Sequence, residues 1–185
     1  YTPRQIGTRT DWSRPAGGEL HTCARRVDGT LWCWGHNTLG AIGDGTIVTR
    51  LAPVQVGITW RSVDAGSFHG CATRTDGTLW CWGGNTQGQL GDGTTTQRGV
   101  PTAIGVGARW ADVAAGGFHS CATRGDGTLW CWGANSSGQV GDGTLVGASV
   151  PTAVGTDATW AGVSAGSYHT CGTRTDGTLW CWGSN

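Results

Sequence analysis

Short runs in which bulky apolar residues alternate with small or polar ones recur along the chain. The clearest run, Leu-Trp-Cys-Trp at residues 79–82, follows a second short run at residues 69–74 across an Asp-Gly pair. A period of two is typical of β-strands, and an Asp-Gly pair between two such runs predicts a β-hairpin. No segment shows the period of an amphipathic helix, so the sequence predicts an all-β fold.

The hairpin pattern recurs four times, which indicates tandem repeats. The copies occupy residues 21–37, 69–85, 119–135 and 169–185. Each unit adds a run that starts at a tryptophan and a short run that follows a proline, so we expect four strands in about 50 residues. Such units predict the blades of a β-propeller, with a β-solenoid as the alternative. The predicted repeats are 11–58, 59–108, 109–158 and 159–185.

The two ends of the chain together make up one further unit. Residues 1–3 align with 99–101, which precede the last strand of a repeat, whereas residues 159–185 lack that strand. We therefore expect residues 1–10 to complete the last blade and close the sheet edge. Two arrangements remain open: a closed four-bladed ring, and an excised or engineered segment whose end edges pair with other chains.

The repeated string supports a family resemblance over the whole chain. The pattern GxxHxCAxxxDGTLWCWGxNxxGQLGDGT, followed by a proline and a short apolar strand, resembles the regulator of chromosome condensation repeat family. The added cysteines suggest a bacterial variant of it. The resemblance implies a propeller of four-stranded blades, commonly with seven blades, and it implies no single activity because members differ in function.

The eight cysteines form four pairs whose members are ten residues apart. A type I turn with Gly77 in the left-handed conformation places Cys71 opposite Cys81 at a distance that a disulfide accepts. We predict disulfides in all four hairpins; the alternatives are buried free thiols and, less favoured, zinc with His36 as the nearest extra ligand. The predicted pairs are Cys23–Cys33, Cys71–Cys81, Cys121–Cys131 and Cys171–Cys181.

Tryptophans recur at the same places in every repeat, which favours a structural role over stacking platforms for sugars. The predicted core positions are Trp32, Trp34, Trp80, Trp82, Trp130, Trp132, Trp180 and Trp182. Four further tryptophans, at 12, 60, 110 and 160, begin the repeats.

Repeated polar residues give weaker candidates for a site. Histidines at 21, 69, 119 and 169 suggest hydrogen bonds to loop backbone rather than a metal site. Aspartates of the GDGT loops, at 44, 92 and 142, suggest turns rather than calcium ligands. A candidate surface for an anionic partner comprises Arg26, Arg74, Arg124, Arg174, Arg50 and Arg98, although neighbouring aspartates favour local neutralisation.

Charge and composition exclude several classes of function. Twelve basic and twelve acidic residues give a net charge of zero, which argues against a nucleic-acid binder. No apolar run is long enough to span a membrane, so no membrane insertion is expected. No catalytic motif or carboxylate pair is evident, and we expect no enzymatic activity, no metal and no cofactor.

The favoured hypothesis is a secreted or cell-surface scaffold that binds another protein through loops, because disulfides indicate an oxidising compartment. Residues 47–52, 95–100 and 145–150 differ most between repeats and are the candidate contact surface. The alternatives are a carbohydrate-binding module that uses exposed tryptophans, an enzyme-inhibiting propeller, and a fragment that self-associates through its terminal blade edges.

Overall fold

The computed structural model describes residues 2–184, which contain fifteen β-strands and no helix. The strands form four antiparallel sheets, here called blades 1 to 4. Blade 1 comprises β1 (Trp12–Gly17), β2 (His21–Arg26), β3 (Leu31–Gly35) and β4 (Arg50–Gln55). Blade 2 comprises β5 (Trp60–Ala65), β6 (His69–Arg74), β7 (Leu79–Gly83) and β8 (Arg98–Ile104). Blade 3 comprises β9 (Trp110–Ala115), β10 (His119–Arg124), β11 (Leu129–Gly133) and β12 (Ala148–Ala153). Blade 4 comprises β13 (Trp160–Ala165), β14 (His169–Arg174) and β15 (Leu179–Gly183).

Each blade is built around the predicted hairpin. In blade 2 the Arg74 amide donates to the Thr78 carbonyl at 2.9 Å, and the Gly77 amide donates to the Arg74 carbonyl at 3.0 Å. Gly77 has a φ of 82°, a conformation that glycine adopts without a Cβ penalty. Asp76 accepts hydrogen bonds from the Thr78 amide and hydroxyl, which stabilises the turn. The predicted left-handed conformation of Gly77 in this turn is therefore confirmed.

This turn fixes the register that pairs the cysteines. Cys71 lies directly opposite Cys81, and the other blades repeat the pairing. All four predicted disulfides are present with Cα–Cα distances of 4.0–4.1 Å, and no free cysteine occurs in residues 2–184. The disulfide prediction is confirmed, and the alternatives of free thiols and of zinc at these pairs do not apply.

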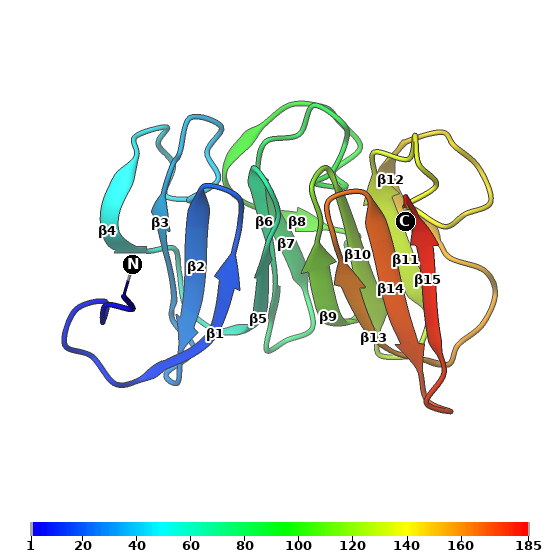
Figure 1. The fold of residues 1–185 in the computed structure, drawn as a ribbon, viewed down its shortest axis with the longest axis horizontal. Helices are drawn as coiled ribbons and strands as arrows, with labels where there is room; N and C mark the ends of the chain where they lie inside the picture. Colours follow the sequence, from blue (N-terminus) through cyan, green and yellow to red (C-terminus); the bar gives the residue numbers. More distant parts are fainter. Residues whose placement is uncertain (1, 185) are drawn as a thin grey trace.

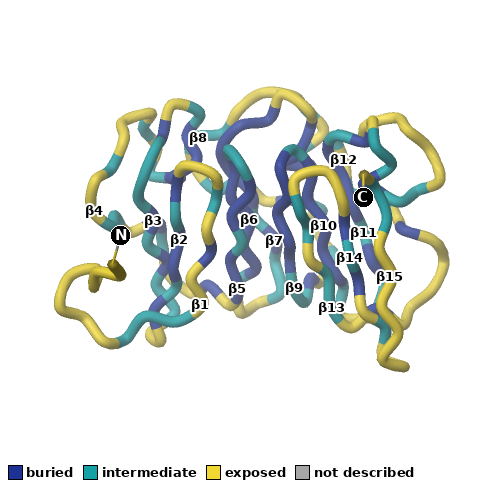
Figure 2. The backbone as a smooth tube through the Cα atoms, in the orientation of Figure 1, coloured by how far each residue is buried: buried dark blue, intermediate teal, exposed yellow. Residues whose placement is uncertain are grey.

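The hydrophobic core lies between the blades. One cluster contains Cys71, Leu79 and Cys81 from blade 2 together with Trp110 and Trp132 from blade 3. Equivalent clusters lie between blades 1 and 2 and between blades 3 and 4. Figure 2 shows that buried backbone is concentrated in the two middle blades. The disulfides of blades 1, 2 and 3 thus pack against the tryptophans of the next blade along the chain.

A polar network crosses the same interface. The Ser120 hydroxyl of blade 3 donates to the Gln89 carbonyl of blade 2 at 2.8 Å, and it lies 2.9 Å from His69 Nε2. Trp132 Nε1 donates to that carbonyl at 2.9 Å. In the next interface Thr170 takes the place of Ser120. His69 and His119 therefore bind side-chain hydroxyls of the next blade, which corrects the prediction of loop backbone partners for these two residues. His21 has no such partner, because Gly70 occupies the equivalent position of blade 2.

The ends of the molecule differ from the sequence-based expectation. Blade 4 has three strands, and residues 2–11 belong to no strand. Blades 1 and 4 lie at opposite ends of a row of blades, as Figure 1 shows. The prediction that residues 1–10 complete the last blade is therefore wrong for residues 2–10, and residue 1 lies outside the described part. The described residues form an open arc rather than a closed four-bladed ring, because neighbouring blades pack in the order 1-2-3-4 and blades 1 and 4 lie apart.

Candidate functional site

Three long loops form the most variable surface of the molecule. Residues 36–49, 84–97 and 134–147 connect the third and fourth strands of blades 1, 2 and 3. Figure 1 shows them along one edge of the row of blades. The first half of each segment predicted as a contact surface lies at the end of a loop, and the second half lies in β4, β8 or β12, so the structure brings these segments to equivalent places on successive blades.

A buried asparagine holds each loop in a fixed conformation. Asn85 is fully buried, and its Nδ2 donates to the carbonyls of Thr94 and Thr96 at 3.0 Å. Its Oδ1 accepts a hydrogen bond from the Leu90 amide at 2.9 Å. Asn37 and Asn135 make the equivalent bonds in the other loops. Sequence reasoning missed this role, although an asparagine recurs at this position in the repeated string.

The loops of blades 1 and 2 are also fixed to the next blade. The Gly45 amide donates to the Gly99 carbonyl at 2.8 Å, and the Gly93 amide donates to the Ser149 carbonyl at 2.9 Å. Internal bonds and these anchors limit the motion of the loop backbone. Side chains beyond the anchors can therefore vary on a rigid support, the arrangement found in many binding surfaces.

The loops of blades 1 and 3 each carry a pair of adjacent exposed apolar side chains. Ile47 and Val48 are 62% and 56% exposed, and Leu145 and Val146 are 68% and 72% exposed. The equivalent pair in blade 2 is Thr95 and Thr96. Exposed apolar pairs at fixed positions indicate a surface that contacts another molecule. We call Ile47, Val48, Leu145 and Val146 the apolar loop pairs.

A row of aromatic residues, which sequence reasoning missed, lies at the turns after the first strand of blades 2, 3 and 4. Phe68 and Phe118 have ring centroids 5.9 Å apart, and Tyr168 is 53% exposed. Phe118 and Tyr168 line a hollow with Gln87. The signal was a recurrent aromatic residue directly before the histidine in three of the four repeats.

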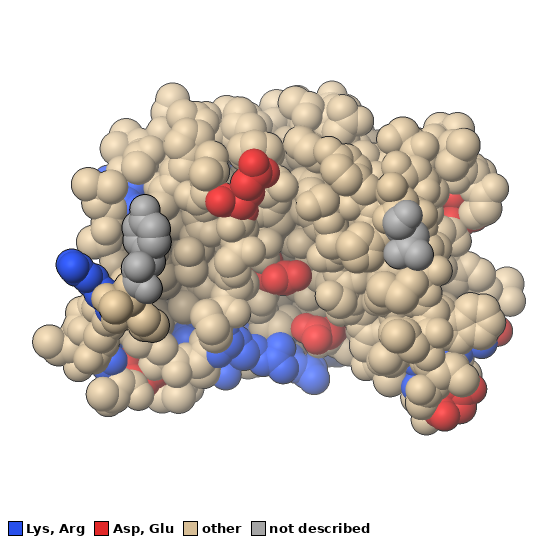
Figure 3. All heavy atoms as spheres, viewed as in Figure 1, with Lys and Arg blue, Asp and Glu red and all other residues tan. Residues whose placement is uncertain are grey.

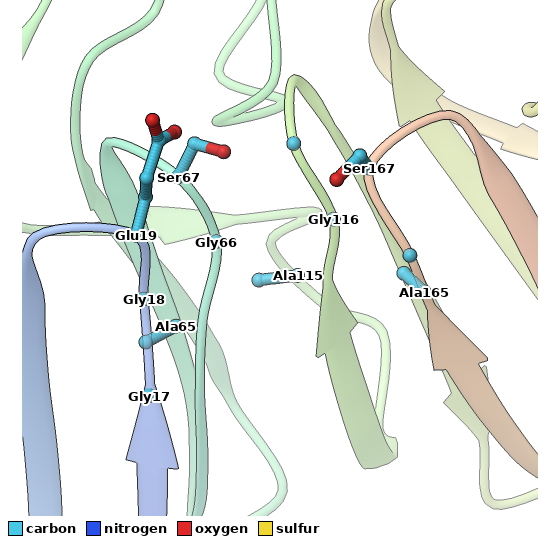
Figure 4. Close-up of a pocket in the computed structure, with 12 residues that line it drawn as sticks. Gly17, Gly18, Glu19, Ala65, Gly66, Ser67, Ala115, Gly116, Ala165 and Ser167 are labelled. Atoms are coloured by element: carbon cyan, nitrogen blue, oxygen red, sulfur yellow. The ribbon is translucent and has the colours of Figure 1, made fainter.

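The same turns line an open groove of about 350 Å³. Figure 4 shows that equivalent three-residue segments from the four blades surround it: Gly-Gly-Glu in blade 1, Ala-Gly-Ser in blades 2 and 4, and Ala-Gly-Gly in blade 3. A Cβ at Gly66 would overlap the Gly116 carbonyl and the His69 ring, which explains the glycine there. The Glu19 side chain contributes the single carboxylate in the lining. One carboxylate among backbone groups gives no acid–base pair for catalysis.

The arginines proposed as an anion-binding surface are engaged within the protein. The Arg74 guanidinium lies 4.8 Å from the Trp60 ring centroid and 4.1 Å from that of Trp80, and Arg124 and Arg174 repeat this sandwich. Arg26 forms an ion pair with Asp11. A binding role for these residues stays a prediction, and their cation–π contacts stabilise the blades.

Arg50 and Arg98 pair with aspartates of the GDGT loops. The distances are 2.6 Å from Arg50 to Asp44 and 2.7 Å from Arg98 to Asp92. Burial raises the pKa of Asp92, but hydrogen bonds from Thr94 and Arg98 outweigh this effect and lower it below the ordinary value. These aspartates therefore bind the turn and its arginine, in accordance with the turn interpretation.

Three of the recurring histidines, His21, His69 and His119, are buried in a neutral form. Burial lowers the pKa of His69 to about 3 and that of His119 to about 4. Because the Ser120 hydroxyl donates to Gln89, it must accept from His69, which fixes the proton on Nε2. Within residues 2–184 no cluster of three or more potential metal ligands occurs. The histidines thus serve the contacts between blades.

Most tryptophans predicted to be structural are enclosed. Trp82 and Trp132 are fully buried, and Trp80 and Trp130 are half-buried against arginines. Trp180 is an exception because it is 49% exposed on the incomplete blade 4. The prediction of core tryptophans is therefore wrong for Trp180, because the described part of blade 4 has no fourth strand beside it.

The surface carries no broad basic area on the face shown in Figure 3, where charged groups are scattered among uncharged ones. Within residues 2–184 no helix is both long and apolar enough to cross a membrane. The exposed loops and their apolar pairs are therefore the best-supported candidate site.

Two family profiles match the chain, both described as the regulator of chromosome condensation (RCC1) repeat. One matches residues 76–123 and 126–172. The other matches 16–41, 60–89, 110–139 and 160–185, one segment in each blade. Together the matches cover more than half of the chain. Among curated proteins, none matches the chain significantly.

Solved structures with the same fold include yeast RCC1 (Prp20) bound to Kap60. It has a TM-score of 0.84 and 22% identity, and the match covers 98% of this chain and 46% of that one. A Saccharomyces cerevisiae Prp20p structure, whose description names binding to Gsp1p and histones, has a TM-score of 0.76 and 28% identity over 89% of this chain and 44% of that one. The ectodomain of the Physcomitrella patens receptor kinase CR4 has a TM-score of 0.62 and 24% identity, covering 99% of this chain and 44% of that one. The chain thus spans less than half the length of these proteins.

Proposed function

The chain belongs to the regulator of chromosome condensation (RCC1) repeat family, and from that premise we propose that it is a non-enzymatic module that binds another protein through its loop surface. The observation that carries the proposal is the set of apolar loop pairs on rigid, disulfide-supported blades. The solved relative Prp20 is described in complex with a protein and as a binder of others, which supports this class of function.

An extracellular or cell-surface location accompanies this proposal. All eight cysteines are paired, and disulfides persist in oxidising compartments but are rare in the cytosol and nucleus. The expected partner is therefore a secreted or surface protein with an apolar contact patch. Neither a bound sugar nor inhibition of an enzyme is proposed, because most tryptophan faces are enclosed and no feature of the loops identifies an enzyme target.

Capture of partners by loop variants tests the proposal. The immobilised chain is incubated with an extract of secreted and surface proteins, and the retained proteins are quantified by mass spectrometry. A variant that changes all four apolar loop pair residues to serine should lose specific partners. The matched control T95S/T96S alters the equivalent positions of blade 2 and should retain them.

The outcome has two clear alternatives. If the serine variant and the control retain the same proteins, the loop surface is not the contact and the proposal fails. If the chain retains no protein specifically but binds members of a glycan array, the carbohydrate-binding alternative replaces it. Circular dichroism establishes that each variant keeps the fold, which we expect because all substituted side chains are exposed.

A further inference from the structure

A hollow of about 270 Å³ lies between blades 3 and 4, beside the turns that follow β9 and β13. Phe118 and Tyr168, which belong to these turns, form part of its lining, and the long loops of blades 2 and 3 supply the rest. The lining residues are Gln87, Phe118, Ala134, Ser136, Gln139 and Tyr168. Three successive blades therefore build the hollow from residues between 87 and 168.

The side chain of Gln139 gives this hollow a buried hydrogen-bond donor without a partner. Gln139 is fully buried, and within residues 2–184 its Nε2 has no hydrogen-bond acceptor. Its Oε1 accepts from the Ser137 amide at 2.9 Å, which identifies the other end of the side-chain amide as the donor. Buried polar groups are nearly always hydrogen-bonded, so each exception calls for an explanation. A ligand that brings an acceptor into the hollow is such an explanation.

Hydrogen bonds from blade 4 fix the position of this donor. The Gln139 carbonyl accepts from the Thr170 hydroxyl at 2.8 Å and from Trp182 Nε1 at 3.0 Å. Together with the bond from the Ser137 amide, these contacts hold both the backbone and the side chain of Gln139. The donor is therefore pre-organised, and a ligand that binds to it loses little free energy in ordering the site.

The corresponding place between blades 2 and 3 is occupied by apolar side chains. There the ring centroids of Phe68 and Phe118 are 5.9 Å apart. The Leu39 side chain lies so close to Gly84 that a Cβ on this glycine would be 3.2 Å from Leu39 Cδ1. In the next interface along the chain, Gln87 takes the position of Leu39. The hollow between blades 3 and 4 is therefore a more polar version of a repeated contact.

The chemistry of the lining favours a neutral ligand that has an acceptor and an apolar ring. None of the six lining residues carries a charge at neutral pH, so a charged ligand would lose hydration without gaining a counter-ion. Phe118 and Tyr168 offer aromatic surface to an apolar ring. A proline and the residue before it meet both needs, because the preceding carbonyl is an acceptor and the proline has no N–H to leave unpaired.

We propose that this hollow binds an extended segment of a partner protein that contains a proline. The carbonyl before the proline accepts from Gln139 Nε2, and the proline ring packs against Phe118 and Tyr168. Gln87 and Ser136 are exposed and offer polar groups to the flanking backbone of the segment. This proposal rests on the proposed protein-binding function, and it adds a second contact because the apolar loop pairs lie outside this lining.

Peptide arrays test the proposal. Acetylated pentapeptides Ala-X-Pro-Z-Ala, with uncharged residues at X and Z, are compared with counterparts in which alanine replaces the proline. The chain should bind a subset of the proline peptides and none of their alanine counterparts. Q139E keeps the acceptor for the Ser137 amide but removes the donor, so it should weaken binding about tenfold.

The matched control is Q89E, which makes the same change at the equivalent position of blade 2. Gln89 is 1% exposed, and its Oε1 accepts from the Gln87 amide at 2.9 Å, so the two variants alter equally buried and equally bonded side chains. Q89E should bind the peptides as the unaltered chain does. Y168A removes an exposed ring from the lining and should also weaken binding. Circular dichroism checks the fold of each variant, and the exposed position of Tyr168 keeps the test valid if Q139E unfolds.

Nuclear magnetic resonance reports on the contact directly. The best-bound peptide should shift the side-chain amide signals of Gln139 in the ¹⁵N-labelled chain and leave those of Gln89 in place. Equal binding of proline and alanine peptides, equal affinity of folded Q139E and Q89E, or unweakened binding by Y168A overturns the proposal. A glycan that shifts the Gln139 signals where no peptide does so also overturns it.

These results are distinguishable from those of the loop-surface test. The variant with serine at all four apolar loop pair residues should still bind the proline peptides, because its hollow is unaltered. If no peptide binds while partner capture still depends on the apolar loop pairs, this proposal fails and the proposed function stands. If peptides bind but capture does not depend on the loop pairs, the loop surface is wrong and the hollow remains as the contact.

Discussion

Removal of one hydroxyl between blades 2 and 3 should weaken the whole array. Ser120 is fully buried, donates to the Gln89 carbonyl and accepts from His69 Nε2. In S120A the Gln89 carbonyl still accepts from Trp132, but His69 loses its hydrogen-bond partner. His69 Nδ1 already has no partner in the structure, so the buried imidazole would have none at all.

The size of the effect follows from this loss. A buried polar group left unpaired costs about 1–3 kcal/mol. For a chain of this length 1 kcal/mol corresponds to a shift of roughly 2–4 °C in Tm, so a loss of about 2 kcal/mol gives a drop of about 4–8 °C. Thermal unfolding followed by circular dichroism under non-reducing conditions measures it.

The conservative variant S120T provides the control. Thr170 occupies the equivalent position in blade 4 with its hydroxyl 2.8 Å from His119 Nε2, so threonine fits this contact. S120T should therefore keep a Tm close to that of the unaltered chain. A Tm for S120A within 1 °C of the unaltered value, or an equal loss in S120T, refutes the role assigned to this hydrogen bond.

Three further predictions concern the disulfides, the histidines and the stacked arginines. Non-reducing peptide mapping should find only disulfides between cysteines that are ten residues apart, and a disulfide between blades would contradict the assigned pairs. Reduction should lower the free energy of unfolding by up to roughly 2–3 kcal/mol per disulfide. Stability should fall as the pH drops from about 6.5 towards 4, because burial lowers the pKa of His21 and His119 to about 4 and that of His69 to about 3, so the unfolded chain binds protons first. Urea unfolding at pH 7, 5.5 and 4.5 checks this, and a flat profile contradicts it. R124Q should lower the free energy of unfolding, measured with urea, by about 1–2 kcal/mol, because the Arg124 guanidinium lies between two tryptophan rings. The control R61Q changes an exposed arginine and should not lower it. Equal stability of the two variants excludes a contribution from stacking.

The sequence predicted those features that depend on neighbouring residues. The Asp-Gly turn sets the hairpin register within a few residues, so the opposition of Cys71 and Cys81 followed from local geometry. The contact between His69 and Ser120 joins residues 51 positions apart, and no local pattern identifies it. The prediction that the N-terminal residues complete the last blade failed for a similar reason. The alignment shows which strand blade 4 lacks, but it does not show how far apart the fold places the two ends of the chain.

The candidate surface likewise has features that the sequence predicted and features that depend on contacts between distant residues. Variation between repeats correctly indicated exposed segments around residues 47–52 and 145–150. The predicted arginine surface did not account for aromatic rings that the fold places on both sides of a guanidinium. The side chain of Arg74 is close to Trp60 only because β5 pairs beside β6, and this is a property of the sheet rather than of either segment.

Because the core lies between blades, stability depends on the number of interfaces between blades rather than on the number of repeats. Four blades in an open arc enclose three apolar clusters, so a single repeat on its own encloses none. Addition of one repeat to an arc adds one cluster together with the residues that form it. Contact between two free blade faces adds a cluster without adding any residue. Such a contact therefore buries more apolar surface per added residue than the addition of a repeat does.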